Sequence, residues 1–380
     1  MNLAKEPDEH SVFIIILNWN NAPDTIECLS SVRQLAYGNY FTVLIDNGSD
    51  DDSLKKILSW AVKNQEVNFH WDKKDKDVIL PMKIIEFATE EINNHNCYLS
   101  SGCKSLQPHE RLIVIKSNQN LGFAKGCNTG IKLAMDNEAD YVMLLNNDAV
   151  LDRNSVSILV RCLETQRQLS GAAARVNYYN NQQMVNNCGG KLLWYGARKY
   201  FYFDSPLKDV PQNGFRQISF INCCAALFRS SLFKNTGLLS EKFFFGEEDF
   251  ELSWRLKKRN MKLACCFDAV AFHKGSASVN EAFSRNALGK TFIYYLNRYI
   301  NMRDHMPGLL WSAWRLVYLV YIFYLLRKTF NLPVKTLIYF SKNLMKFSGK
   351  LSHVSKETFE KTKDAEQIFS RVLSDSYFTD

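Results

Sequence analysis

The chain has 380 residues, of which 46% are hydrophobic and 23% are charged, a balance that is typical of a globular protein with a substantial core. This length allows one large domain with extensions, or two domains. The formal net charge of +8 is moderately basic, but no recognisable nucleic-acid-binding module accompanies it, so we expect no nucleic-acid partner. Residues 1–10 are polar and the apolar run after them is short, so no secretory signal is expected.

The ten cysteines are scattered along the chain, with adjacent pairs at Cys223–Cys224 and Cys265–Cys266. Adjacent cysteines lack the CxxC spacing of a zinc site. Without a secretory signal, a disulfide framework is not expected either. We therefore interpret the cysteines as reduced, mostly buried thiols of a cytoplasmic protein.

Predicted strands and helices alternate over the first part of the chain. Residues 12–17, "VFIIIL", are a continuous β-branched and aromatic run that predicts a buried strand. Helices are predicted at residues 24–35 and 53–62, and residues 120–137 predict a glycine-containing loop that runs into a helix. Further strands are predicted at residues 41–46, 111–115 and 141–145. This alternation indicates an α/β fold with a mostly parallel central sheet flanked by helices.

Two regions depart from this alternation. Residues 63–110 are polar and irregular, and we interpret them as an insertion: a surface excursion or, as the alternative, a lid or acceptor-binding loop. Residues 170–275 predict short strands and hairpins, then a helix with an acidic start and a basic end, and a final strand that ends at His273.

Residues 281–380 predict a helical region. Within it, residues 309–326 are apolar and aromatic with one charge, Arg315, a length at the lower limit for a helix that spans a membrane. Tryptophan and tyrosine favour the membrane interface, so this run and the following "TLIYFSKNLMKF" predict an amphipathic anchor that lies in the plane of a membrane. A helical pair packed on the rest of the protein explains the pattern equally well.

Polar residues follow the predicted strands at 12–17, 41–46 and 141–145. In parallel sheets, the carboxyl ends of the strands form the edge at which ligands bind. Asparagine and aspartate are also common turn residues, so each position alone is a weak signal. The residues concerned are Asn18, Asn20, Asp46, Asn47, Asn146, Asn147 and Asp148.

Five segments, taken together and in this order, resemble family-2 glycosyltransferases of the A-type fold, in particular the rhamnosyltransferase-like and galactofuranosyltransferase-like branch. They are "VFIIILNWNNAPDTIECLSSV", "VLIDNGSDDDS", "NQNLGFAKGCNTGI", "YVMLLNNDAVLD" and "FFFGEEDFELSWRLKKRNMKLACCFDAVAFHKGSAS". The resemblance covers roughly residues 11–305 except the insertion. It implies a catalytic domain over residues 1–280 and a helical C-terminal region over residues 281–380.

The resemblance also implies roles for individual residues. "NND" stands at the family's DXD metal motif, so Asp148 is the expected ligand of Mg²⁺ or Mn²⁺, with His273 completing the metal shell. "EED" stands at the acidic base motif, so Asp249 is the expected catalytic base and Glu248 the competing choice. Glu251 replaces an aspartate of many relatives, which leaves its role open. The residues expected to bind the nucleotide sugar are Asn18, Asn20, Asp46, Asn47, Asn120, Gly122, Lys125, Asn128, Asn146, Asn147 and Arg255.

The implied reaction is an inverting transfer from a UDP- or dTDP-linked sugar to a hydroxyl of a glycan or lipid-linked glycan acceptor. By family analogy, this serves bacterial surface polysaccharide synthesis (O-antigen, capsule or cell-wall glycan), in the cytoplasm or peripherally on the inner face of the cell membrane. One alternative is a sugar nucleotidyltransferase, which typically carries a glycine-rich and Arg/Lys-rich phosphate loop where this chain has "NWNNAPD". The other is a non-catalytic carbohydrate-binding or scaffold protein.

Overall fold

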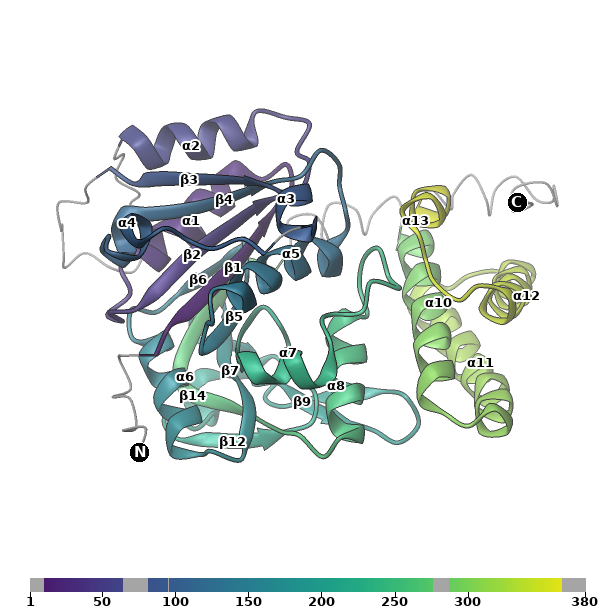
Figure 1. Cartoon of the computed structure of the whole chain (residues 1–380). Coiled ribbons are helices and arrows are strands. Elements are labelled where there is room, and N and C mark those ends of the chain that lie inside the picture. Colours follow the sequence, from purple (N-terminus) through teal and green to yellow (C-terminus); the bar gives the residue numbers. More distant parts are fainter. Residues whose placement is uncertain (1–9, 64–80, 95, 276–286, 364–380) are drawn as a thin grey trace. The chain divides into compact units, whose positions relative to one another are not determined.

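The computed structural model describes residues 10–63, 81–94, 96–275 and 287–363 (Figure 1). The chain divides into two compact units. Unit 1 consists of Met1–Leu192, Arg198–Leu239 and Leu252–Gly275, and unit 2 of Leu193–Ala197, Ser240–Glu251 and Ser276–Asp380. The division after Gly275 lies close to the predicted boundary at residue 280, but two short segments before it belong to unit 2. Residues 1–9, from which no secretory signal was expected, lie outside the described residues.

The centre of unit 1 is a mainly parallel sheet, in the order β5-β1-β2-β4-β3 (Figure 1). The predicted α/β fold and the predicted strands are confirmed. All five strands are parallel, so their carboxyl ends meet at one edge of the sheet. Their bounds are β1 (Val12–Asn18), β2 (Tyr40–Asp46), β3 (Lys83–Ala88), β4 (Arg111–Lys116) and β5 (Tyr141–Asn146).

The sheet continues beyond β5 through shorter and partly antiparallel strands. β13 joins β5 antiparallel, β7 follows, and β14 pairs parallel with β7 and antiparallel with β6 and β12. The predicted short strands and hairpins are thus present. They are β6 (Ala149–Leu151), β7 (Leu169–Tyr178), β8 (Met184–Asn187), β9 (Gly190–Leu192), β10 (Arg198–Tyr200), β11 (Ser205–Pro206), β12 (Phe215–Ile218), β13 (Ala225–Arg229) and β14 (Lys262–His273).

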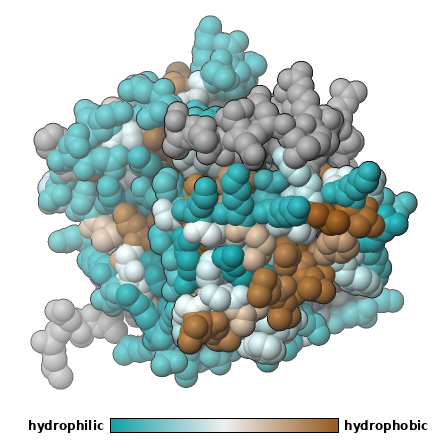
Figure 2. All heavy atoms as spheres, turned by 90° about the vertical axis from the view of Figure 1, so that its right-hand side faces the viewer, coloured by the Kyte–Doolittle hydropathy of each residue, from teal (hydrophilic) through white to brown (hydrophobic). Residues whose placement is uncertain are grey.

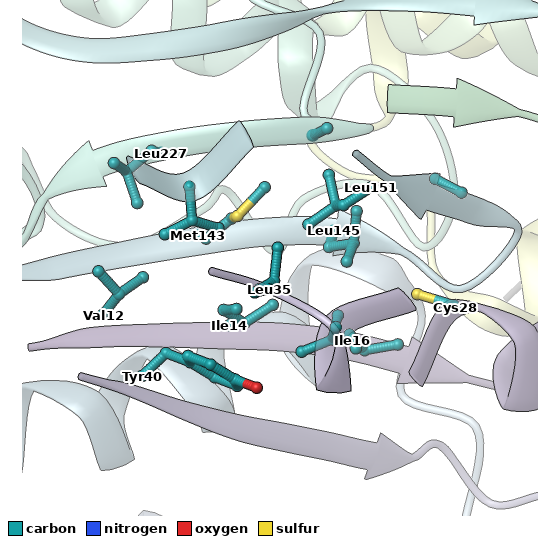
Figure 3. Close-up of a cluster of buried hydrophobic side chains, with 14 of the residues drawn as sticks. Val12, Ile14, Ile16, Cys28, Leu35, Tyr40, Met143, Leu145, Leu151 and Leu227 are labelled. Carbon is teal, nitrogen blue, oxygen red and sulfur yellow. The ribbon is translucent and has the colours of Figure 1, made fainter. Parts of the chain in front are cut away.

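Helices cover both faces of the sheet, because alternate residues of the central strands point to opposite sides. Ile14 and Ile16 of β1 belong to one buried cluster, whereas Phe13 and Ile15 belong to the other. Figure 3 shows the first cluster, in which Ile14 and Ile16 lie beside residues of the neighbouring β5. The helices and 3₁₀ turns of this unit are α1 (Ala22–Arg33), α2 (Ser53–Lys63), α3 (Thr89–Asn94), α4 (Ser101–Lys104), η2 (Pro108–Glu110), α5 (Phe123–Asp136), α6 (Ser155–Thr165), η3 (Leu207–Asp209) and α7 (Ser230–Thr236).

Part of the predicted insertion belongs to the sheet. Residues 83–88 form β3, which extends the sheet at its edge by parallel pairing with β4. The interpretation of residues 63–110 as an irregular excursion is therefore wrong for this segment. The side chains of β3 are half-buried or exposed, as expected at an edge, so the strand lacks the continuous apolar run of its neighbours. Residues 64–80 of the predicted insertion lie outside the described residues.

Unit 2 is helical, as predicted, and α10 packs against α11, α12 and α13 within it. Pro307 caps the start of α11 and Asn331, in the left-handed conformation with φ +48°, ends it. The next helix starts directly after Pro333. The helices are α10 (Ala287–His305), α11 (Gly308–Phe330), α12 (Val334–Lys350) and α13 (Lys356–Lys363), and the division between the units falls within α8 (Glu248–Lys258).

The cysteines are as predicted. All ten are free thiols, and eight of them are buried. Burial is the main cause that raises the pKa of the Cys28 thiol, which lies in the core. These cysteines therefore act as small apolar core residues.

Candidate functional site

Two polar residues end the neighbouring strands β1 and β2 and are hydrogen-bonded to each other. Asn18 is fully buried, donates from Nδ2 to Asp46 Oδ1 at 2.9 Å, and accepts from Thr25 Oγ1 at 2.8 Å. Asp46 also accepts from Ser49 Oγ at 2.6 Å. Asn20, with a φ of +52°, donates its backbone N–H to the same Ser49 hydroxyl at 3.0 Å. These bonds fix the loops after both strands.

The loop after β4 is connected to the same edge by Asn47. Its Nδ2 donates to Asn120 Oδ1 at 3.0 Å, and its Oδ1 accepts from the backbone N–H of Leu121 at 3.0 Å. Asn120 Oδ1 also accepts from the N–H of Gly122, the residue that caps α5 with a φ of +80°. The predicted residues Asn47, Asn120 and Gly122 are therefore brought together.

Gly48 makes this close approach of the two loops sterically feasible. Its φ is +68°, and a Cβ built there would lie 2.4 Å from the carbonyl carbon of Gln119. Real Cβ atoms do not approach backbone so closely, so any side chain at residue 48 would push the two loops apart. Sequence reasoning did not single out this glycine, although it lies in the quoted loop after β2.

The loop after β5 brings Asn146 and Asp148 together with His273, the last residue of β14. The distance from His273 Nε2 to Asp148 Oδ1 is 3.0 Å, and to Asn146 Nδ2 it is 3.4 Å. The antiparallel pairing of β6 with β14 sets this arrangement, because His273 lies opposite Ala149. Burial opposes the charged imidazole, but Cys224 and Asp148 outweigh burial and raise the pKa of His273 well above its ordinary value.

Hydrogen bonds connect the loop after β5 to the residues that end β1 and β2. Asn147 Nδ2 donates to Thr25 Oγ1 at 3.0 Å, and that hydroxyl donates to Asn18 Oδ1 at 2.8 Å. Since Asn18 in turn donates to Asp46, a continuous series runs from Asn147 to Asp46. The carboxyl edge of the sheet thus carries one connected network of polar side chains, at the position where open α/β sheets bind ligands.

Asp148 and His273 are the residues of this edge that fit a divalent cation. Adjacent ligands of an octahedral Mg²⁺ or Mn²⁺, bonded at about 2.1 Å, lie about 3.0 Å apart. This matches the 3.0 Å between Asp148 Oδ1 and His273 Nε2. Among the described residues, no group of three or more His, Cys, Asp or Glu side chains is arranged to hold a metal ion. A cation here would therefore complete its shell with substrate oxygens and water, as Mg²⁺ usually does.

A charged cluster beside this pair was not predicted. Lys274 directly follows His273 and forms ion pairs with Asp24 at 2.6 Å and Glu27 at 2.5 Å. Its ammonium group lies 4.9 Å from the centre of the Tyr179 ring. Burial lowers the pKa of Lys274, but its two carboxylate partners prevail and raise it. The adjacency of Lys274 to His273 was the signal available in the sequence.

Three other predicted binding residues take no part in the hydrogen bonds described above. Asn128 is buried and exchanges two hydrogen bonds with the backbone of Leu239, at 2.9 and 3.0 Å. Arg255 donates to the carbonyls of Thr236 and Gly237, which end α7. Lys125 is exposed on α5. The sequence could not separate these roles from ligand binding, because an amide or a guanidinium serves backbone carbonyls as readily as phosphates.

Unit 2 holds the predicted acidic base motif at the start of α8. Glu247 has a φ of +77° and a buried side chain, and its carboxylate forms a two-point ion pair with Arg298, at 2.5 and 3.1 Å. Asn301 donates to the same carboxylate at 2.9 Å, and the Arg298 guanidinium lies 3.5 Å from the centre of the Phe250 ring. Glu247 is thus fixed by the helical unit, whereas Glu248 and Asp249, in the first turn of α8, are half-buried.

Comparisons with known proteins agree with the fold. The model of glycosyl transferase family 2 matches residues 99–237, which include Asn120 and the loop after β5. The structure of the mannosyltransferase PcManGT from Pyrobaculum calidifontis, in complex with GDP-Man and Mn²⁺, has a TM-score of 0.50 and 14% identity, over 98% of this chain and 89% of that one.

Residues 1–349 of TarS from S. aureus give a TM-score of 0.48 at 11% identity, over 95% of this chain and 89% of that one. A second TarS structure gives 0.42 at 12%, over 78% of this chain and 42% of that one. No curated protein matches the sequence. The fold is the A-type glycosyltransferase-like α/β fold, with a mainly parallel sheet and a helical C-terminal region, and residues 99–237 within it are similar to glycosyl transferase family 2.

Proposed function

We propose that this chain is an inverting, cation-dependent glycosyltransferase that moves a hexosyl or deoxyhexosyl unit from a UDP- or dTDP-linked donor to a hydroxyl of a glycan or lipid-linked glycan. The observation that carries the proposal is the connected polar edge of unit 1. There the series from Asn147 to Asp46 adjoins the pair formed by Asp148 and His273.

The donor is expected to bind along this edge. The loops after β1, β2 and β4, held by Asn18, Asp46 and Asn47, form a rigid frame for the base and ribose. Asp148 and His273 would hold Mg²⁺ or Mn²⁺, which supplies positive charge to the leaving diphosphate. A frame fixed before the ligand arrives loses little further conformational entropy on binding, which favours affinity.

The chemical step needs a base for the acceptor hydroxyl. Asp249, with Glu248 as the alternative, takes the proton as the hydroxyl oxygen attacks the anomeric carbon. The new carbon–oxygen bond forms while the bond from that carbon to the diphosphate oxygen breaks. The proton ends on the carboxylate and the electron pair leaves with the nucleoside diphosphate. A single displacement of this kind inverts the anomeric centre.

Donor binding tests the proposal most directly. Calorimetry with UDP-, dTDP- and GDP-sugars should show binding of one nucleotide class that requires Mn²⁺ or Mg²⁺. GDP-mannose belongs in the panel because the mannosyltransferase similar in fold was solved with it. Asp148→Asn should weaken cation-dependent binding about 100-fold or more, since even changes in the outer shell of a metal site cost 10- to 100-fold.

Asp268→Asn is the matched control, because it removes an exposed carboxylate from the same strand that carries His273. It should bind the donor as the wild type does. If no nucleotide sugar binds to folded protein under any cation condition, the scaffold alternative stands instead. Product analysis distinguishes the proposal from the nucleotidyltransferase alternative. A transferase releases nucleoside diphosphate, whereas a nucleotidyltransferase that acts on a nucleotide sugar in the reverse direction consumes pyrophosphate.

The choice of base has its own test. Asp249→Asn should lower kcat about 10²- to 10⁴-fold, the usual contribution of a general base, while KM for the donor stays near the wild-type value. Glu248→Gln is the matched comparison, one residue away in the same helical turn. A large loss of kcat in Glu248→Gln but not in Asp249→Asn would make Glu248 the base. Wild-type rates in both variants would show that neither acid is the base.

A further inference from the structure

Two of the C-terminal helices, α11 and α12, carry positive charge only. Residues 308–350 contain no aspartate or glutamate. They contain the following basic residues: Arg315, Arg327, Lys328, Lys335, Lys342, Lys346 and Lys350. Such a one-sided segment, in a chain that holds 39 acidic residues elsewhere, indicates a surface that meets negative charge.

One face of α11 is packed inside unit 2. Trp311 and Trp314 are buried and donate their indole N–H groups to the carbonyls of Tyr299 and Tyr195, at 3.1 and 2.8 Å. Tyr318 stacks on Trp314 with ring centres 4.7 Å apart. The expectation that these three aromatics lie in a membrane interface is therefore wrong: they pack the helix against its own unit.

The opposite face of α11 is apolar and exposed. Val317 and Val320 are 72% and 71% exposed, and Leu309 is 91% exposed. At 100° per residue, these residues together with Leu316 and Tyr324 lie on one side of the helix. Figure 2, which faces the side of the C-terminal helices, shows hydrophobic residues gathered in one area with hydrophilic residues around it.

α12 adds the charge. Its buried apolar residues are Leu337, Phe340, Leu344 and Phe347. Its exposed face carries Lys335, Lys342 and Lys346, spaced by about two turns and one turn, with Ile338 between them. The aliphatic face of α11 suits the acyl chains of an anionic membrane surface. The lysine face of α12, which packs against α11, suits the phosphate headgroups.

We propose that the exposed faces of α11 and α12 together bind an anionic lipid bilayer, with α11 lying in the plane of the interface. α11 is the helix, among the described residues, that is long and apolar enough to cross a membrane. Spanning would expose the other side of α11 to lipid and break the two indole hydrogen bonds, so the in-plane arrangement is favoured. This inference does not depend on the proposed glycosyl transfer.

Vesicle co-sedimentation of the full chain tests the proposal. The wild type should sediment with phosphatidylcholine vesicles that contain phosphatidylglycerol, far less with phosphatidylcholine alone, and less as salt is raised. Changing Lys335, Lys342 and Lys346 together to Gln should weaken binding about 10- to 100-fold. Changing Lys55, Lys56 and Lys63 of α2 to Gln removes the same charge from exposed positions of unit 1, and should leave binding unchanged.

A second variant tests the apolar contribution. Val317→Gln combined with Val320→Gln should also weaken binding at least about tenfold, including at high salt, where electrostatic attraction is screened. Circular dichroism and thermal unfolding check that each variant is folded. The proposal is overturned by wild-type protein that stays in solution with anionic vesicles, by equal binding of the two triple variants, or by unchanged binding of the valine variant. Self-association through α11 in place of vesicle binding, seen by size-exclusion chromatography, would also overturn it.

Discussion

The motifs at residues 146–148 in unit 1 and residues 247–249 in unit 2 both end in aspartate, but they differ in how their acids are held. Asp148 contacts a titratable partner, His273, at 3.0 Å, in a partly exposed pair. Glu247 contacts a permanently charged partner, Arg298, and both side chains are 1% exposed. In the first pair the imidazole can gain or lose a proton, whereas removing either partner of the second pair leaves a buried charge.

The three acids of the second motif are not equivalent. Glu247 connects the start of α8 to α10 through its hydrogen bonds with Arg298 and Asn301. These contacts fix the residue that directly precedes Glu248 and Asp249. The strained φ of +77° at Glu247 is maintained by these contacts. A run of three acids thus contains one buried acid with a structural role beside two acids that are half-buried.

The largest expected effect follows from breaking the buried pair. Arg298→Met should lower the free energy of unfolding by about 3–5 kcal/mol, because it leaves the Glu247 carboxylate buried without its partner. Urea unfolding measures this. The double variant Arg298→Met with Glu247→Gln should recover part of the loss, since no buried charge remains.

The exposed pair of Lys242 with Asp304 is the matched control, at 48% and 38% exposure. Lys242→Met should cost at most about 1 kcal/mol, as is usual for surface pairs. Equal losses in the two variants would mean that burial does not distinguish the two ion pairs.

A smaller effect is expected from the pH dependence of the first motif. The pKa of His273 is raised above its ordinary value of 6.5, so the stabilisation from its protonated form is complete below pH 6.5. It is lost as the pH rises through the raised pKa. In the presence of a chelator, the free energy of unfolding should therefore fall above pH 6.5 by at most about 1.4 kcal/mol per pH unit.

His273→Gln should remove this component of the pH dependence. His353→Gln, at an exposed position of unit 2, should retain it. A slope that is unchanged in His273→Gln would show that other groups carry it.

The smallest effect is expected at Arg255, which the sequence suggested as a ligand of the diphosphate. Because its guanidinium serves the carbonyls that end α7, Arg255→Met should leave donor affinity within about twofold of the wild type. Calorimetry measures the donor affinity of Arg255→Met and Asp148→Asn under the same conditions, so that the two losses can be compared directly. A loss of tenfold or more would restore the diphosphate-binding role.

The sequence by itself determined the central fold and the carboxyl edge. The apolar runs at residues 12–17, 41–46, 111–115 and 141–145 can only be buried on both faces, which requires a parallel sheet covered by helices. The polar residues that follow them must then meet at one edge, and Asn18, Asp46, Asn47 and Asn146 do so. Of the five central strands, β3 was not predicted, because a half-exposed edge strand has no continuous apolar run.

Tertiary structure alone decided which polar residues have structural roles. Asn128 and Arg255 were indistinguishable from ligand-binding residues until their backbone partners, more than a dozen residues away, were known. The same holds for Glu247, whose partner Arg298 is 51 residues further along the chain. Side-chain hydrogen bonds depend on distance in space, and no local pattern of residue types encodes a partner that the fold brings from elsewhere.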